Sequence, residues 1–277
     1  MTYTFFLDID GTLIYSDRRY PSEALLRIVS EAQENGHRFF INTARSYGNV
    51  NPELFPIDRF DGLCSGCGTC ITYGGKMIYK NVLAPEKALR VAELLMNAKP
   101  DIKFVLEGIE ALYPTFTNPW NPTAVYPFNT VAELRENFPN MEIQKFATYG
   151  GDLLTQELAK PLTEDFDVYF HPHYTEIVPT GYSKGKAAEI VEKLLDVPHE
   201  ATVSVGDSHN DISMFRSCAI SIAMGNATDE VKKEASTVTE SVADDGAAKA
   251  IARLCGISYE RILRDLKTNS RAASATN

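Results

Sequence analysis

Near-continuous apolar runs alternate with segments of helical spacing at the start of the chain. Residues 3–7 are apolar or β-branched and predict a strand over 3–8, and Phe39 to Ile41 belong to a second predicted strand over 37–42. Residues 21–35 between them place Leu25, Leu26, Ile28 and Val29 at helical spacing. An apolar run without polar alternation is typical of a strand buried on both faces, as in a parallel sheet. The strand–helix–strand order therefore predicts a βαβ unit with a right-handed crossover.

The same alternation returns in the second half of the chain. It predicts helices over 183–195, up to 217 and over 246–254, and strands over 202–205 and 221–224. Shorter β-like pieces lie at 60–64, 69–73 and 76–79. These elements predict an α/β fold, a doubly wound, Rossmann-like parallel-sheet core formed by residues 1–81 and 181–264. The small, polar residues 265–277 are expected to be a frayed tail.

The pattern between these two segments is different. Residues 82–180 combine predicted helices at 86–96, 129–137 and 151–159 with strands at 103–106, 142–146 and 167–171 and a proline-rich loop at 114–127. Because the strand-to-polar-loop pattern resumes after Val178, this segment is expected to be a smaller α+β cap domain inserted into the core.

Composition narrows the classes of partner. The chain has 277 residues, 44% of them hydrophobic, and a net charge of −10, which disfavours nucleic acid or an anionic membrane surface as the main partner. No apolar stretch approaches the roughly 20 residues of a membrane span, and Met1 leads into the first strand without a signal-peptide pattern. We expect a cytoplasmic protein, a monomer or weak homodimer, whose partner is a small molecule.

Cysteine usage does not suggest disulfides. The five cysteines are an odd number without secretory context. Cys64, Cys67 and Cys70 have a spacing that occurs in zinc and iron–sulfur sites, but no nearby His or Cys supplies a fourth ligand. We therefore favour buried structural thiols; whether the cluster binds anything stays open.

The first strand ends in two acids one residue apart, Asp8 and Asp10, followed by Gly11. Side chains i and i+2 of a strand point to the same side, so two like charges would lie close together and require a cation. Mg²⁺ suits such a site because it takes few carboxylates and leaves room for phosphate oxygens. The alternative is an Asp-Gly surface turn.

Three further polar groups follow other predicted elements or lie at their start. They are Asn42-Thr43-Ala44-Arg45, then Lys184, then Gly206-Asp207-x-x-Asn210-Asp211. Ligands of open α/β sheets bind beyond the carboxyl ends of the strands, so all four groups are expected to converge at one sheet edge.

This ordered set resembles the haloacid dehalogenase-like hydrolases, in particular the Cof-type phosphatases with a large α/β cap (class IIB), and the resemblance covers the chain to about residue 255. It implies that Asp8 is a nucleophile that forms an aspartyl-phosphate and that Asp10 is the general acid and base. It implies Mg²⁺ held by Asp8, the backbone carbonyl of Asp10 and Asp207, with Asp211 in the second shell or on a metal-bound water. It also implies phosphoryl binding by Thr43, Ala44, Lys184 and Asn210, with Arg45 in the same loop.

One position departs from the family pattern. Thr-Gly-Arg is usual in the second motif, whereas this chain has Thr43-Ala44-Arg45. Ala44 keeps the amide of the glycine, but a positive φ at this position would require a different local loop.

Each of the other site residues, taken singly, also has a structural interpretation. Thr43 could cap a helix, Lys184 could be a solvated first-turn residue, and Asp207 or Asp211 could be turn or N-cap residues.

The cap is expected to choose the substrate, with candidate segments Thr148-Tyr149-Gly150-Gly151-Asp152 and His171-Pro-His173-Tyr174-Thr-Glu176. The two histidines are more often surface or structural residues than ligands. The main hypothesis is a Mg²⁺-dependent phosphatase acting on a small phosphorylated metabolite, either a sugar phosphate or a phosphorylated cofactor. The alternatives are phosphomutase-type transfer and a non-catalytic phosphometabolite-binding module.

Overall fold

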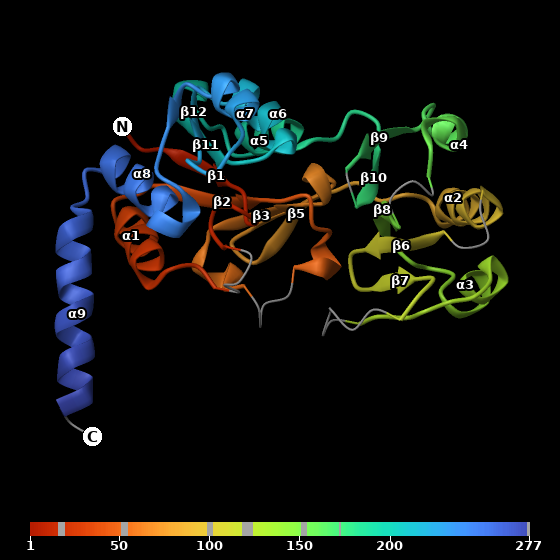
Figure 1. The fold of residues 1–277 in the computed structure, drawn as a ribbon, viewed down its shortest axis with the longest axis horizontal. Helices are drawn as coiled ribbons and strands as arrows, with labels where there is room; N and C mark the ends of the chain where they lie inside the picture. The colour runs from red at the N-terminus through yellow and green to blue at the C-terminus, as the bar shows by residue number, and fades with distance from the viewer. Residues whose placement is uncertain are drawn as a thin grey trace.

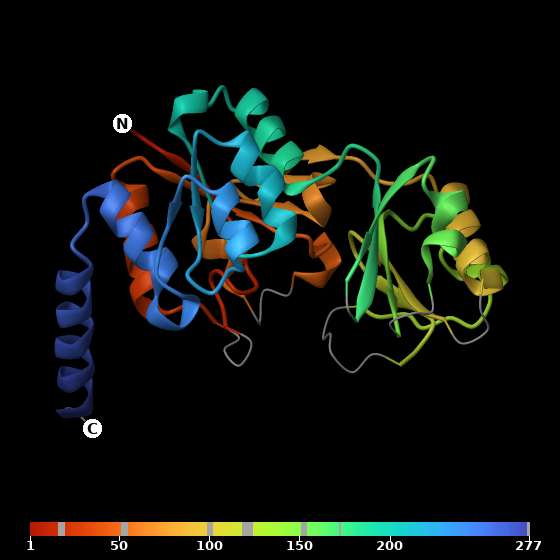
Figure 2. The same ribbon diagram turned by 45° about the horizontal axis from the view of Figure 1, so that its top comes forward.

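The protein consists of a larger and a smaller part that lie side by side (Figure 1). The computed structural model describes residues 1–15, 20–50, 55–98, 102–117, 124–150, 154–171 and 173–275. The smaller part, elements α2 to β10, is called the cap below, and the rest is called the core. The chain enters and leaves the cap near β5 and α5 (Figures 1 and 2).

The core is organised by one eight-stranded sheet with the order β13-β12-β11-β1-β2-β3-β4-β5. Strands from β13 to β3 pair in parallel, and β4 and β5 continue the sheet antiparallel. The strands are β1 (Thr4–Leu7), β2 (Arg38–Asn42), β3 (Gly62–Ser65), β4 (Cys70–Tyr73), β5 (Lys76–Lys80), β11 (Thr202–Gly206), β12 (Ile220–Ala223) and β13 (Thr237–Val238). The predicted α/β class with a central parallel sheet is confirmed.

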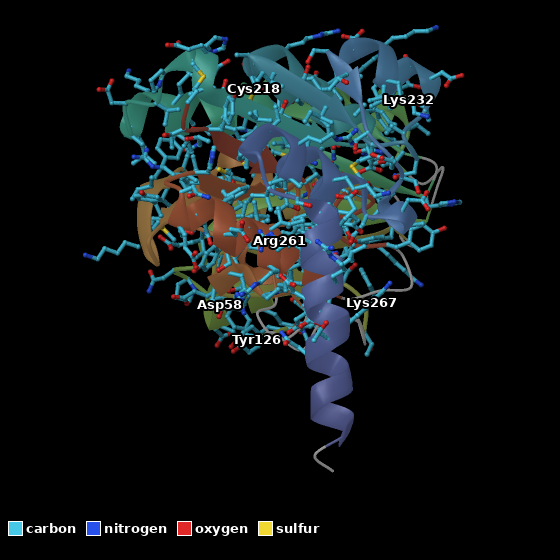
Figure 3. All side chains as sticks on the ribbon, turned by 90° about the vertical axis from the view of Figure 1, so that its left-hand side faces the viewer. Asp58, Tyr126, Cys218, Lys232, Arg261 and Lys267 are labelled. Carbon is cyan, nitrogen blue, oxygen red and sulfur yellow. The ribbon has the colours of Figure 1, made fainter. Side chains whose placement is uncertain are left out.

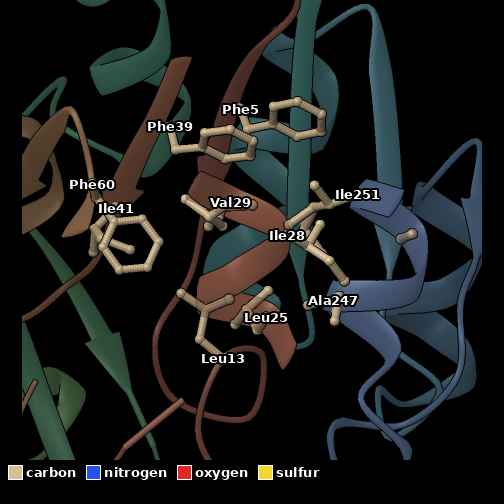
Figure 4. Close-up of a cluster of buried hydrophobic side chains, with 14 of the residues drawn as sticks. Phe5, Leu13, Leu25, Ile28, Val29, Phe39, Ile41, Phe60, Ala247 and Ile251 are labelled. Carbon is tan, nitrogen blue, oxygen red and sulfur yellow. The ribbon is translucent and has the colours of Figure 1, made fainter. Parts of the chain in front are cut away.

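Helices cover this sheet with apolar side chains. They are α1 (Glu23–Glu34), α5 (Lys184–Leu194), α6 (Ile212–Ser217), α7 (Asp229–Glu234) and α8 (Gly246–Cys255), and a further helix, α9 (Tyr259–Ala275), packs against α1 and α8. The Ser22 side chain caps α1 by accepting from the Leu25 amide. Figure 4 shows Ile28 and Val29 of α1 beneath the stacked rings of Phe5 and Phe39, whose centroids are 4.7 Å apart. The predicted helical spacing in this segment thus corresponds to a buried face.

The cap has its own five-stranded sheet and its own apolar cluster. The sheet order is β7-β6-β8-β10-β9, and all its pairs are antiparallel. The strands are β6 (Lys103–Gly108), β7 (Leu112–Pro114), β8 (Ile143–Tyr149), β9 (Phe166–Phe170) and β10 (Tyr174–Pro179), and the helices are α2 (Pro85–Ala98), α3 (Val131–Asn137) and α4 (Gln156–Ala159). Strand β10 was not anticipated, and it lies inside the sheet between β8 and β9.

The expectation of a frayed tail at 265–277 is wrong for residues 265–275, which continue helix α9. The start of α9 is anchored because Ile262 is buried in the core and the Arg261 guanidinium pairs with the Glu31 carboxylate of α1. Figure 3 shows the helix running past Arg261 and Lys267 and projecting from the core. Residues 276 and 277 lie outside the described residues. Among the helices that the structure describes, α9 included, none is both long and apolar enough to span a bilayer.

Candidate active site

Asp8 lies directly after β1, and its amide donates to the Val205 carbonyl at 3.1 Å, so the ladder between β1 and β11 reaches the acid itself. The side chain is buried. Thr43 follows β2, the next strand of the sheet, and its amide donates to the Cys64 carbonyl at 2.9 Å. The carboxyl ends of neighbouring parallel strands thus bring the first two predicted groups to one edge.

The third group, Lys184, lies in the first turn of α5 and is fully buried. Its ammonium Nζ is 2.7 Å from Asp8 Oδ1 and 2.6 Å from Asp211 Oδ1. Burial alone lowers the pKa of Lys184, but the carboxylates of Asp211 and Asp8 outweigh it and raise the pKa above its usual range. Lys184 is therefore a permanently charged, buried partner of two acids and not a solvated first-turn residue.

Asp207 and Asp211 belong to the turn after β11. Asp211 Oδ2 accepts from the amides of Asp207 and Ser208, both at 2.9 Å, so this side chain fixes the turn as a capping box. Since its other oxygen accepts from Lys184, both Asp211 oxygens are engaged by the protein. Asp207 Oδ1 accepts from the Thr12 hydroxyl at 2.9 Å. Asp211 thereby holds the loop that presents Asp207.

Asp8, Asp207 and Asp211 form one acidic group whose ligand atoms all lie within 4.8 Å of one another. Gly11 permits this approach, since its φ is +81° and a Cβ would lie 2.2 Å from Asp207 Oδ2. Burial, together with the Asp211 carboxylate, raises the pKa of Asp207 to about 6. Burial also raises the pKa of Asp8, although Lys184 opposes it. Three carboxylates this close together, two of them beside the Lys184 ammonium, are a donor set that fits a divalent cation with oxygen preference.

Asp10 is placed differently from Asp8. Its carboxylate is exposed and forms a two-point pair with Arg45, with Nη2 to Oδ1 at 2.5 Å and Nε to Oδ2 at 2.9 Å. The acidic group above does not include the Asp10 side chain. Arg45, a predicted member of the phosphoryl-binding loop, here contacts the predicted general acid instead, because a guanidinium matches a carboxylate at two points.

The loop after β2 accommodates Ala44 at the position where the family pattern has glycine. Among the described residues other than glycine, positive φ occurs at Cys67, Asp196 and Asp245, so Ala44 needs no left-handed conformation. The Thr43 hydroxyl accepts from the Arg45 amide at 3.1 Å. It stabilises this loop, and it does not cap a helix in this structure.

Asn210, in the turn after β11, accepts from the Ser208 hydroxyl at 2.8 Å.

Two further residues, Thr12 and Asn226, complete the edge of the site. Thr12 holds Asp207, as described above. Asn226 donates to the Gly11 carbonyl at 2.9 Å and accepts from the Val242 amide at 2.8 Å, so it fixes the turn after β1. Neither residue was predicted as a site residue; the one signal was their place in polar turns that follow strands.

The cysteine cluster lies beneath the loop after β2. Cys64, Cys67 and Cys70 are all buried, free thiols. Burial, more than the nearby Glu176 carboxylate, raises the pKa of Cys67 to about 12, so this thiol stays protonated at neutral pH. This setting is that of structural cysteines.

The cap contacts the core through buried polar groups. Lys145 Nζ donates to the Ala44 carbonyl at 2.9 Å, and Gln144 Oε1 accepts from the Tyr47 amide at 2.7 Å. Of the two candidate cap segments, residues 148–150, 171 and 173–176 are described, whereas Gly151, Asp152 and Pro172 lie outside the described residues. The two segments meet, because Tyr149 pairs with Tyr174 across β8 and β10.

Comparison with known proteins relates the whole arrangement to one family. A family model described as haloacid dehalogenase-like hydrolase matches residues 5–251. The Bacillus subtilis (strain 168) protein YkrA is 30% identical over 90% of this chain and 96% of its own length. The 5-amino-6-(5-phospho-D-ribitylamino)uracil phosphatase YitU of the same strain is 26% identical, over 89% and 95% of the two chains. A haloacid dehalogenase-like hydrolase from Bacteroides thetaiotaomicron superimposes with a TM-score of 0.77 at 25% identity, covering 92% of this chain and all of that one.

Proposed function

The chain belongs to the haloacid dehalogenase-like hydrolases, in their Cof-type phosphatase group, and from this premise we propose that it is a Mg²⁺-dependent phosphatase of small phosphorylated metabolites. The observation that carries the proposal is the arrangement of buried Asp8 and Lys184 with half-buried Asp207 at the carboxyl edge of the sheet. A carboxylate that lies beside a fixed cation and within reach of a metal site is suited to attack phosphorus.

In the proposed first step, an Asp8 oxygen forms a bond to phosphorus while the ester bond to the leaving oxygen breaks. Asp10 donates a proton to that oxygen, so the alcohol leaves uncharged. In the second step, Asp10 takes a proton from water, the water oxygen bonds to phosphorus, and the bond between Asp8 and phosphorus breaks. The exposed Asp10 side chain serves this role by exchanging its pair with Arg45 for the substrate oxygen.

The remaining residues would bind the phosphoryl group and the metal. Asp8 and Asp207 would hold Mg²⁺, together with the backbone carbonyl of Asp10, while Asp211 keeps its place as the support of the Asp207 turn. When bound, the metal supplies positive charge to the phosphoryl oxygens. Lys184, the Thr43 hydroxyl, the Ala44 amide and the Asn210 amide would contact the same oxygens. The cap, proposed as residues 82–180, would cover the site and exclude water.

The proposal is tested by product analysis. With Mg²⁺ present, we expect release of inorganic phosphate from p-nitrophenyl phosphate and from a panel of phosphorylated metabolites, and loss of release on chelation. Phosphate that moves to a second hydroxyl of the substrate, without release, would instead establish a phosphomutase. Stoichiometric binding without turnover across the panel would establish a binding module.

Metal binding is expected to depend on pH. The pKa of Asp207, raised to about 6, means that the folded chain binds more protons than the unfolded chain between about pH 4 and 6, so metal-free stability falls as the pH rises through this window. Because Mg²⁺ needs deprotonated carboxylates, it should raise the melting temperature very little at about pH 5 and by about 2–4 °C or more at about pH 7.5. Thermal melts with chelator and with Mg²⁺ measure this difference, and Asp207→Asn should abolish it. An equal Mg²⁺ effect at both pH values would contradict the prediction.

A further inference from the structure

In the described part of the cap, the helices lie on one face of its sheet only. Figures 1 and 2 show α2, α3 and α4 on the side of this sheet away from the core. Phe104, Phe146 and Ile177 belong to the apolar cluster that includes α2. Because side chains alternate along a strand, the neighbours of these residues lie on the opposite face, which is turned toward the core. This opposite face is called the open face below.

The open face carries an unusual buried charge group. Glu107 of β6 is paired in register with Lys145 of β8, and Glu176 of β10 is paired with Ala147, two residues further along β8. Lys145 Nζ is 2.5 Å from Glu176 Oε1, and all three charged side chains are buried. Burial raises the pKa of Glu176, but the Lys145 ammonium outweighs it and lowers the pKa to about 2. Glu176 is therefore a permanent acceptor.

This group contains more acceptor than donor capacity. Lys145 donates to the Glu176 carboxylate and to the Ala44 carbonyl, and the Glu107 carboxylate, in register with Lys145, helps to raise the pKa of this ammonium. The Glu107 carboxylate has a long contact, 3.4 Å from the Ser46 amide, and Glu176 Oε2 lies 3.7 Å from His171 Nε2. The Ser46 hydroxyl and His171 Nε2 are both buried without a hydrogen-bond partner. Polar atoms in this state are expected where a polar ligand completes the hydrogen bonding.

This group lies beside the loop after β2, because Lys145 donates to the Ala44 carbonyl at 2.9 Å, and aromatic rings adjoin it. The His171 ring stacks on Tyr174 at 4.3 Å. Burial, together with the Glu176 carboxylate, raises the pKa of Tyr174. Tyr149, paired in register with Tyr174, extends the same face. A phosphoester anchored at Lys184 would direct its alcohol part toward these residues.

We propose that Glu176, fixed by Lys145, is a specificity-determining residue that accepts hydrogen bonds from a hydroxyl or ammonium group on the alcohol part of the substrate. The enzyme therefore prefers phosphomonoesters of polyols, sugars or amino sugars to esters that carry a second anion. This inference rests on the proposed function and specifies its substrate class.

The charge balance of the open face is the reason for this expected substrate preference. A carboxylate or second phosphate on the substrate would meet Glu107 and Glu176, while the Lys145 ammonium is already engaged by Glu176 and Ala44. A hydroxyl or ammonium group supplies donors to these acceptors. A site built around buried acceptors rejects substrates that leave the acceptors unpaired, because the desolvation cost is not recovered.

Matched substrate pairs test the proposal with the native enzyme. The pairs are glucose 6-phosphate with 6-phosphogluconate and glycerol 3-phosphate with 3-phosphoglycerate; in each, the second member carries a carboxylate. In the pair with the higher kcat/KM, we expect the kcat/KM of the ester without a carboxylate to exceed that of the ester with a carboxylate by at least about tenfold. Equal or reversed preference would overturn the inference. Absence of phosphate release from p-nitrophenyl phosphate would instead overturn the proposed function, so the two failures are distinguishable.

Glu176→Gln tests the residue itself, with Glu142→Gln as the matched control, since Glu142 is a partly exposed cap carboxylate that pairs with Lys80. In Glu176→Gln, the ratio of kcat/KM for the better sugar or polyol ester to that for p-nitrophenyl phosphate should fall at least about tenfold, and the discrimination against the carboxylate should shrink. Glu142→Gln should keep the native ratio. If Glu176→Gln lowers kcat/KM for both substrates equally, Glu176 has only a structural role and the inference fails. If the variant does not fold, the native pairs decide.

Discussion

Asp8→Asn is expected to lower kcat by at least about 10⁴-fold with p-nitrophenyl phosphate and Mg²⁺, because a neutral amide is a poor nucleophile for phosphorus. The Asp8→Asn variant should still fold. The pKa of Asp8 is raised by burial and by the Asp211 and Asp207 carboxylates, so the folded state already disfavours charge at this position. Removing that charge relieves repulsion, and Lys184 keeps Asp211 as its partner.

Two measurements separate loss of chemistry from loss of structure in this variant. Its thermal melt in chelator should match or exceed that of the native protein, whereas the stabilisation by Mg²⁺ should weaken because one proposed ligand is gone. An Asp58→Asn variant, changed at an acid in a short turn of the core, serves as the control and should retain native turnover. Turnover of p-nitrophenyl phosphate by Asp8→Asn near the native rate would refute the nucleophile assignment.

The core was predictable because its signals are local. The continuous apolar run before Asp8 and the spacing from Leu25 to Val29 each indicate burial within a few residues. The cap strand β10 was missed for the opposite reason. Its charged Glu176 and terminal Pro179 argue against an internal strand, and only pairing with β8 and β9 compensates for them. The tail was missed because the start of α9 is anchored by Arg261 to Glu31, which lies 230 residues away along the chain.

The candidate site shows the same division. Strand ends and order in the chain were sufficient to bring Asp8, Lys184, Asp207 and Asp211 together. The partner of each side chain was not predictable, since the contact of Arg45 with Asp10 depends on side-chain rotamers that no spacing reveals. The role of Lys145 was also hidden, because it depends on how the cap sheet meets the loop after β2.

Lys184→Met is expected to destabilise the protein by about 3–5 kcal/mol, the usual cost of removing one member of a buried ion pair. Methionine has nearly the shape of lysine and fills the space, so the loss reports charge rather than packing. Without the ammonium, Asp8 and Asp211 are buried close together with no cation between them. Chemical denaturation in chelator measures the difference in the free energy of unfolding.

Lys186→Met is the matched control, because Lys186 lies in the same first turn of α5 but is exposed and pairs with the exposed Glu189. Exposed pairs contribute little, so this variant should change stability by less than about 1 kcal/mol. The Lys184→Met defect should also shrink at acidic pH, where protonation removes the unpaired carboxylate charges. A loss for Lys184→Met no larger than that for Lys186→Met would mean that the buried ammonium does not offset the acidic group. The convergence of Asp8, Asp207 and Asp211 would then depend on the backbone turns that hold them.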